Sequence, residues 1–465
     1  MAEHDASLPM DARLYAFRYF YSVFPLPDWG SIAEWKRERE RIRRQIWLCS
    51  GLNDRTMAYK ARGRVIRMFE HEGITVENIR IETLPGVYAM GNLYRPAEAR
   101  GKLPLILNPH GHGMHSRTRG SAVRAMNQAM LGFTTFAWSM TAHEDDAMQI
   151  EHRAFLEGPE KPVCNVLGLS SFGLQLHNSI KVLDYLLSRG DVDGRRVGCT
   201  GASGGGTQTY YLAAVDDRVK VAAPAVMLSG HMQGGCVCEN APLLHLQYST
   251  VHFAGLIAPR PLMLTGCTGD WTHHVREREF ASLKELYGLY GKEDAVDFFY
   301  QDEKHNYDQA SREHVNAWMV RWLKDRSFAE KRIPESDAPA PRPEQLLVHR
   351  TPVPPVKNAV TSTRELIGVW TRFHQKPDAE ANTASMLNLE YPDKGDILVR
   401  NQTPRYASRK GALGENMMVY GRFSESSGLT CRFVPPKRGK PCFVVLRKWK
   451  DLDALQRFAN RPPTA

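Results

Sequence analysis

One ten-residue stretch constrains the fold of this chain more than any other. Residues 197–206 read VGCTGASGGG, in which a short apolar run is followed by Ser203 between small residues. The pattern G-x-S-x-G is typical of a serine at the tip of a sharp turn from a buried strand into a helix, because small neighbours let that turn close. The segment TQTYYLAAV that follows predicts the helix, whose free N–H groups favour a developing oxyanion. A glycine-rich turn without chemistry is the alternative.

Apolar runs and amphipathic stretches alternate on both sides of this turn. Strands are expected at KLPLILNP, FTTFAWSM, RRVGCTG, VKVAAPAVM, RPLMLTG and AVDFFY, preceded by the alternating pair ITVENIRIETLPG and VYAMGNLYRP. Continuous apolar strands separated by helical stretches predict a mostly parallel sheet with helices on both faces, which is an α/β fold.

Composition divides the chain into four parts. We expect an N-terminal helical segment in residues 1–62, an α/β catalytic domain in 63–328, a Pro- and Ala-rich linker in 329–344 and a small β-rich basic region in 345–465. The first part contains SIAEWKRERERIRRQIWLCSGL, whose Ile and Trp residues are spaced for one apolar helix face.

The positive charge of the chain belongs to its C-terminal part. Residues 341–465 contain 21 Lys and Arg against 11 Asp and Glu, a surplus that equals the net charge of the whole chain, +10. The preceding residues are therefore neutral, which argues against a nucleic-acid partner for the catalytic domain. The basic region is either a solvated face or a surface for a polyanion.

Neither a membrane segment nor a signal peptide is evident. The chain has no run of about 18 apolar residues, as a transmembrane helix requires, and the start MAEHDASLPM is acidic and lacks an apolar core. We expect a cytoplasmic protein without a membrane partner, or a secreted or periplasmic one if a signal has been removed.

The eight cysteines are scattered along the chain, which does not indicate a disulfide framework. The closest pair is Cys236-Val237-Cys238. This C-x-C spacing is too short for an ordinary disulfide, and no second cysteine pair accompanies it to complete a zinc site. The pair is predicted to pack within a loop.

A serine nucleophile needs a base, and the base needs an orienting acid. The strand RPLMLTG runs into Cys267-Thr268-Gly269-Asp270, and His305 comes after the strand that begins AVDFFY. Because the carboxyl ends of parallel strands meet at one edge of a sheet, both residues are expected beside Ser203. The chain order Ser, Asp, His matches the order of one known class of serine hydrolases.

Other acids and histidines compete for these roles. Asp302 and Glu303 are rivals for the acid, but they lie on the same loop as the candidate histidine. His273 and His274 are rivals for the base, but they precede the last strand and are predicted to line the pocket or start a helix.

The segment NPHGHGMH, residues 108–115, follows the third apolar strand. Glycines at such a strand end let backbone N–H groups face a substrate oxygen. We therefore predict an oxyanion hole formed by the amide of Gly204 together with the amide of Gly111 or His112.

The same segment offers an alternative as a metal site. His110, His112 and His115 form H-x-H-x-x-H, and acidic residues 144–146 follow the next strand. No acidic residue lies within the run itself, so the histidines are predicted to close the loop. Neither a metal nor a cofactor is expected.

Four sequence blocks together resemble the α/β-hydrolase superfamily. GNLYRP…LPLILNPHGHG, VGCTGASGGGTQT, APRPLMLTGCTGDWT and EKHNYDQASREHVNAWMVRWL, within residues 64–325, are similar to the bacterial acetyl xylan esterase and prolyl-oligopeptidase-related branch. The resemblance implies that Ser203 is the nucleophile, His305 the general base and then acid, and Asp270 its partner. The N-terminal helical segment and the basic region lie outside the resemblance.

The resemblance implies a serine carboxylester hydrolase that forms an acyl-enzyme and acts on a carbohydrate ester, either a small molecule or a polysaccharide. Trp138, Trp271 and Tyr307 lie near predicted loops of the site and are candidates to stack on sugar rings, or else they are core or rim aromatics. A dienelactone-type hydrolase or a peptidase is the alternative, although no propeller domain precedes the strands. An inactive scaffold with a polyanion-binding tail is the alternative of another class.

Overall fold

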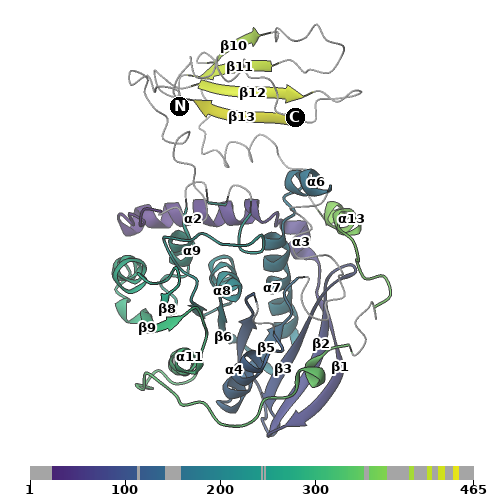
Figure 1. Cartoon of the computed structure of the whole chain (residues 1–465), viewed down its shortest axis with the longest axis vertical. Helices are drawn as coiled ribbons and strands as arrows, with labels where there is room; N and C mark the ends of the chain where they lie inside the picture. Colours follow the sequence, from purple (N-terminus) through teal and green to yellow (C-terminus); the bar gives the residue numbers. More distant parts are fainter. Residues whose placement is uncertain are drawn as a thin grey trace. The chain divides into compact units, whose positions relative to one another are not determined.

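The computed structural model describes residues 24–112, 116–141, 159–241, 244–245, 248–349 and 356–373, and four strands between residues 397 and 449 (Figure 1). The chain divides into two compact units, of which the larger spans residues 20–382.

The larger unit is built on a nine-stranded sheet in the order β1-β2-β3-β5-β4-β6-β7-β8-β9. The strands are β1 (Arg62–His71), β2 (Ile74–Leu84), β3 (Val87–Pro96), β4 (Leu103–Pro109), β5 (Thr134–Trp138), β6 (Val192–Ala202), β7 (Val221–Ala225), β8 (Leu262–Gly269) and β9 (Val296–Lys304). The first three strands pair antiparallel, and β3 also pairs antiparallel with β5. Every pair from β5 to β9 is parallel, so the prediction of a mostly parallel α/β sheet is confirmed.

Helices cover both faces of this sheet (Figure 1). The described α-helices between β4 and residue 328 are α4 (Arg119–Met130), α6 (Lys161–Val166), α7 (Ser171–Ser188), α8 (Gly204–Val215), α9 (Thr250–Gly255), α10 (Ala281–Gly288) and α11 (Gln309–Leu323). Strand side chains alternate between faces, so Leu105 and Leu107 enter one core with α7 and α8, while Ile106 enters another with α11. Among the described residues, no helix has the length and apolar character that crossing a lipid bilayer requires.

The predicted amphipathic helix before the sheet is α2 (Ile32–Cys49), followed by the short α3 (Asp54–Ala58). Ser31 and Glu34 form a capping box at the N-terminus of α2, which satisfies two free N–H groups. Its apolar residues Trp35, Ile42 and Ile46 are buried, and the helix packs against α8 and α9. The helix therefore belongs to the same packed unit as the sheet.

Residues 329–342, which we call the strap, contain neither helix nor strand but are attached to the sheet unit. Arg312 on α11 forms a bidentate ion pair with Glu335 of the strap, with N–O distances of 2.6 and 2.7 Å. Both side chains are largely buried. The strap leads into α12 (Pro343–Leu346), whose Leu346 carbonyl accepts a hydrogen bond from Asn92 on β3.

The segment after the strap contains a helix where mainly strands were expected. In α13 (Thr363–Phe373), Leu366, Val369 and Trp370 lie on one face and are buried. They pack in a core cluster with Leu84 and Leu169. The spacing i, i+3, i+4 is the signal of an amphipathic helix, and tertiary packing of that face stabilises a helix only three turns long.

The described part of the smaller unit is a four-stranded antiparallel sheet in the order β10-β11-β12-β13. Its strands are β10 (Ile397–Gln402), β11 (Asn416–Gly421), β12 (Gly428–Val434) and β13 (Phe443–Trp449). All four strands lie within residues 345–465, so the prediction that this region contains strands is confirmed.

Candidate functional site

The candidate residues lie at the carboxyl ends of neighbouring strands. Ser203 follows β6, the loop with Gly111 follows β4, Asp270 follows β8 and His305 follows β9. Because the strands from β4 to β9 run parallel, these ends lie at one edge of the sheet. Ligand sites of open α/β sheets are found at this edge.

Ser203 is held in a backbone conformation that few residues adopt. Its φ of 56° and ψ of −126° lie in a region that costs a residue with a Cβ about 1–3 kcal/mol. Its N–H donates to the Ala225 carbonyl on β7 at 3.1 Å, and α8 begins at the next residue. The serine therefore stands at the N-terminus of a helix, where the helix dipole favours negative charge.

The two glycines of the G-x-S-x-G pattern are required by a close approach of the chain. A Cβ on Gly201 would lie 2.2 Å from the Pro109 carbonyl oxygen at the end of β4, and one on Gly205 would lie 2.4 Å from the same atom. Both distances are far below van der Waals contact. The serine turn and the loop after β4 are thus packed backbone against backbone.

Asp270 and His305 are in direct contact. Nδ1 of His305 lies 2.6 Å from Oδ2 of Asp270, and the Asp270 side chain is 2% exposed. The other carboxylate oxygen accepts hydrogen bonds from the backbone and the hydroxyl of Thr272. This arrangement fixes the imidazole ring and leaves its Nε2 for a reaction partner.

The charge of Asp270 is stabilised by these contacts. Burial opposes ionisation of the carboxyl, but hydrogen bonds from His305 and then from Thr272 outweigh it and hold the pKa of Asp270 below its ordinary value. The group is therefore a carboxylate at neutral pH. A buried carboxylate on Nδ1 can stabilise the imidazolium that forms when a histidine accepts a proton.

None of the rival acids and histidines takes part in the contact between the Asp270 carboxylate and His305. Asp302 accepts a hydrogen bond from the Thr268 hydroxyl at 2.5 Å and is exposed, as is Glu303. Nδ1 of His273 lies 2.7 Å from the Asp270 carbonyl oxygen rather than from its carboxylate. His274 is exposed and lies against the rings of His231 and His273.

The loop after β4 lies directly against the serine turn. A Cβ on Gly111 would lie 2.4 Å from the Ala202 carbonyl oxygen and 2.9 Å from the Ser203 Cβ. His110 closes the loop, because its Nε2 accepts from the Met140 N–H at 2.8 Å and its Nδ1 lies 3.0 Å from the Gly111 carbonyl oxygen. The backbone of Gly111 is thus held beside the N-terminus of α8.

The three candidate sugar-stacking aromatics differ in burial. Trp138 is 1% exposed and stacks on Phe136 in the core. Tyr307 is 5% exposed, and its hydroxyl lies 2.7 Å from that of Thr200. Trp271 is partly exposed, and its ring centre lies 4.6 Å from that of His305. Protein atoms cover the first two rings, so only Trp271 is placed to contact a ligand beside His305.

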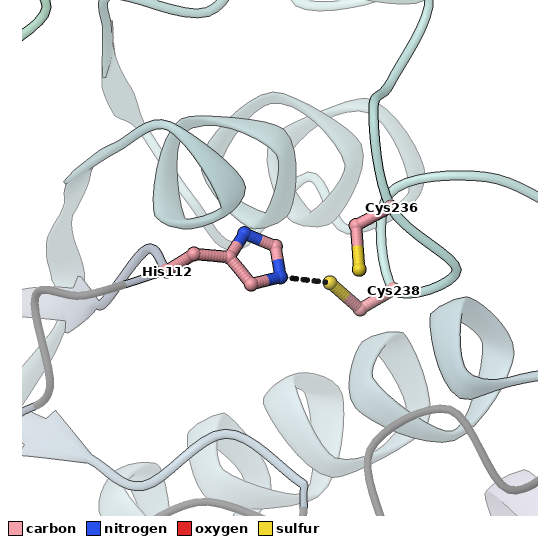
Figure 2. A group of neighbouring side chains, drawn as sticks. All are labelled: His112, Cys236 and Cys238. Carbon is pink, nitrogen blue, oxygen red and sulfur yellow. Dashed lines mark hydrogen bonds between the residues drawn. The ribbon is translucent and has the colours of Figure 1, made fainter.

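The side chain of His112 points toward the two cysteines of the C-x-C pair (Figure 2). Its Nε2 lies 3.2 Å from Cys238 Sγ, and its Nδ1 lies 3.5 Å from Oε1 of Glu239. Hydrogen bonding to the Cys236 side chain and then to Glu239 raises the pKa of His112 to about 10, against the effect of burial. Sequence reasoning predicted neither Glu239 nor the cysteines as site residues.

Part of the alternative metal motif lies outside the described residues, namely His115 and the acidic residues 144–146. Of its described members, His110 is bonded to backbone groups and His112 to a cysteine and a glutamate.

Known proteins share this architecture. No protein-family profile matches the chain. The solved structure of methylesterase BT1017 is 25% identical, with a TM-score of 0.60 over 77% of this chain and 78% of that chain. A glucuronoyl esterase from Solibacter usitatus is 16% identical, with a TM-score of 0.50 over 68% of this chain and 99% of that chain, a similarity of fold alone. The protein has the α/β-hydrolase fold.

A curated relative agrees with this result. YtaP of Bacillus subtilis (strain 168), which carries a provisional hydrolase name, is 26% identical over 249 residues, which are 50% of this chain and 82% of YtaP. The predicted resemblance to α/β-hydrolases is thus confirmed, and the named activities of these proteins support an enzyme with hydrolase activity. In this fold the nucleophile, the acid and the histidine follow one another along the chain, as do Ser203, Asp270 and His305.

Proposed function

We propose that the protein is a serine carboxylester hydrolase that acts through an acyl-enzyme. The observation that carries the proposal is the contact of 2.6 Å between His305 Nδ1 and Asp270 Oδ2, at the same edge of the sheet as the strained turn of Ser203. A histidine oriented by a buried carboxylate at the same sheet edge as a serine on a strained turn is the arrangement that activates a hydroxyl for attack.

The proposed reaction has two halves. Ser203 Oγ attacks the ester carbonyl carbon while His305 takes its proton, and His305 then returns that proton to the leaving alcohol, which leaves an acyl-serine. Water attacks this ester, His305 accepts a proton from the water, and the proton passes to Ser203 Oγ as the acid departs. Backbone N–H groups of Gly204 and of Gly111 or His112 are the proposed oxyanion donors, since Gly111 lies against the serine turn.

The proposed substrate is an ester carried by a carbohydrate. Trp271 supports this choice, because its partly exposed ring beside His305 offers a flat apolar face next to the reacting atoms. Methylesterase BT1017 is named for methyl esters, so a methyl ester of a sugar acid is the first substrate to compare with an acetylated sugar.

The test is hydrolysis of p-nitrophenyl acetate by the wild type and by Ser203→Ala, followed by methanol release from methyl-esterified polyuronate and acetate release from acetylated xylan. Ser203→Ala is expected to lower kcat about 10⁴- to 10⁶-fold. Ser188→Ala, an exposed serine at the end of α7, is the matched control. Activity that survives in Ser203→Ala would overturn the proposal, and the ratio of methanol to acetate identifies the ester.

A further inference from the structure

Three side chains that the proposed hydrolysis does not use form a compact cluster next to the serine turn. The ligand atoms of His112, Cys236 and Cys238 all lie within 4.8 Å of one another. Figure 2 shows the His112 ring directed edge-on at the two sulfur atoms, with Nε2 3.2 Å from Cys238 Sγ. Cys238 is buried and Cys236 partly buried. One imidazole nitrogen and two thiol sulfurs therefore face a common point.

The spacing of these atoms fits one metal ion. With Zn–S bonds of about 2.3 Å and Zn–N bonds of about 2.0–2.1 Å, tetrahedral geometry separates the ligand atoms by about 3.5–3.8 Å. Small side-chain movements bring the observed atoms to these separations. Sulfur and imidazole ligands together select zinc over magnesium or calcium, which prefer oxygen. We propose that His112, Cys236 and Cys238 bind one zinc ion.

Glu239 supplies the outer contacts that zinc sites use to orient their ligands. Its Oε1 lies 3.5 Å from Nδ1 of His112, which presents the opposite nitrogen, Nε2, to the sulfurs. Its Oε2 accepts the N–H groups of Gly235 at 2.7 Å and Cys236 at 3.1 Å. One buried carboxylate thus orients the histidine and shapes the turn that carries both cysteines.

Sheet topology explains how distant residues meet here. His112 follows β4, whereas Cys236 and Cys238 lie in the segment after β7. In the sheet, β4 and β7 are the two neighbours of β6, the strand that ends at Ser203. The proposed site therefore spans the start of α8 and ties the Gly111 loop to the segment after β7.

The proposed zinc has a positioning role. Gly111 directly precedes His112, so a metal bond to His112 restrains the backbone that is proposed to face the substrate oxygen. The described residues supply three ligands, which leaves one position for water or another oxygen. The proposed zinc binding departs from the expectation that the protein has no metal. The binding itself does not depend on the proposed hydrolysis, whereas the positioning role rests on it.

A second group, His231, His273 and His274, also lies within metal-binding range. Its rings contact one another at centroid distances of 4.1–5.4 Å, and His273 Nδ1 lies 2.7 Å from a backbone carbonyl oxygen. The group consists of three histidines and contains no sulfur ligand. It serves here as the control for adventitious binding to histidines.

The test is the metal content of the full-length protein, purified after growth with zinc, washed with a weak chelator and measured by plasma mass spectrometry. About one zinc per chain is expected for the wild type, for His274→Ala and for Cys164→Ser, a buried cysteine elsewhere in the unit. In the double variant Cys236→Ser/Cys238→Ser, the zinc content per chain should fall at least about tenfold. A wild type without zinc, or a double variant that keeps it, would overturn the proposal.

A spectroscopic measurement on the wild type covers the case in which the double variant does not fold. Replacing the metal by Co²⁺ should give the near-ultraviolet charge-transfer absorption of thiolate–cobalt bonds, together with the visible bands of a tetrahedral site. An octahedral, sulfur-free cobalt spectrum would contradict ligation by the cysteines. Neither readout requires hydrolytic activity, so failure of the zinc site and failure of the proposed hydrolase function are distinguishable.

Discussion

Two histidines at the same sheet edge carry a carboxylate on Nδ1, yet their surroundings differ. Asp270 contacts His305 at 2.6 Å, and Glu239 contacts His112 at 3.5 Å. The His305 pair lies at the same edge of the sheet as the strained serine turn, whereas Nε2 of His112 faces Cys238. A carboxylate on Nδ1 selects which nitrogen is presented but not what it does. Whether such a histidine accepts a proton or binds a metal depends on the group that lies next to its Nε2.

Removing the charge of Asp270 from the Asp270–His305 pair is expected to give the largest effect on kcat/KM. Asp270→Asn is expected to lower kcat/KM about 10⁴-fold, because an amide no longer holds His305 in the tautomer that accepts the serine proton. Ester hydrolysis measured alongside zinc content checks this, and the zinc content should stay at the wild-type value. If activity stays within tenfold, Asp270 is not the orienting acid.

Moving the Gly111 loop, which lies against the serine turn and leads into His112, is expected to give the next largest effect on kcat. Gly111→Ala places a Cβ 2.4 Å from the Ala202 carbonyl oxygen, so the loop must shift away from the serine. Loss of one oxyanion donor costs about 10²- to 10³-fold in kcat. The matched control is Gly120→Ala in α4, where a Cβ meets no atom within 4 Å. Equal kcat values for the two variants would contradict the placement of the oxyanion hole.

Weakening the contact between Glu239 and His112 tests the proposed role of this pair in zinc binding. Glu239→Gln keeps the shape of the side chain but removes its charge, and it should lower zinc affinity about 10- to 100-fold, as expected for an orienting contact. Competition with a chromogenic chelator gives this value. Asp270→Asn serves as the control, and an unchanged affinity in Glu239→Gln would show that the carboxylate does not act on the metal.

The smallest expected effect is on the pH dependence of the free energy of unfolding. The folded-state pKa of Asp270 is held below its ordinary value of about 3.9, so the carboxylate stabilises the fold above that pH and this contribution is lost as pH falls through the folded pKa. Urea unfolding at pH 7 and at about pH 3 should show a smaller drop for Asp270→Asn than for the wild type, by about 1 kcal/mol. An equal drop would contradict this role of the contact.

The sequence was sufficient for the parts of the site that depend on chain order. The strand ends that precede Ser203, Asp270 and His305 could be predicted because apolar runs mark buried strands, and parallel strands end at one edge. The turn around the serine could also be predicted, because its close backbone contacts require the glycines of the G-x-S-x-G pattern. Asp270 and His305 are in contact at 2.6 Å, while their roles as acid and base toward Ser203 stay predictions.

The parts that depend on sheet order could not be predicted. His112 and Cys238 are 126 residues apart, and they meet only because β4 and β7 flank β6, which the order of segments along the chain does not reveal. The C-x-C pair was therefore assigned to loop packing. Burial of Trp138 and Tyr307 was also hidden, since a residue at a strand end faces the core or the site according to packing.

The strap has a practical consequence for anyone who shortens this protein. Cutting the chain after α11, at residue 328, would remove Glu335 and leave the Arg312 guanidinium as a largely buried cation without its carboxylate. Arg312 also donates to the Tyr307 carbonyl oxygen, two residues beyond His305. A truncation chosen by composition would thus disturb the histidine loop itself. A minimal version should end after α13, at residue 373 or later.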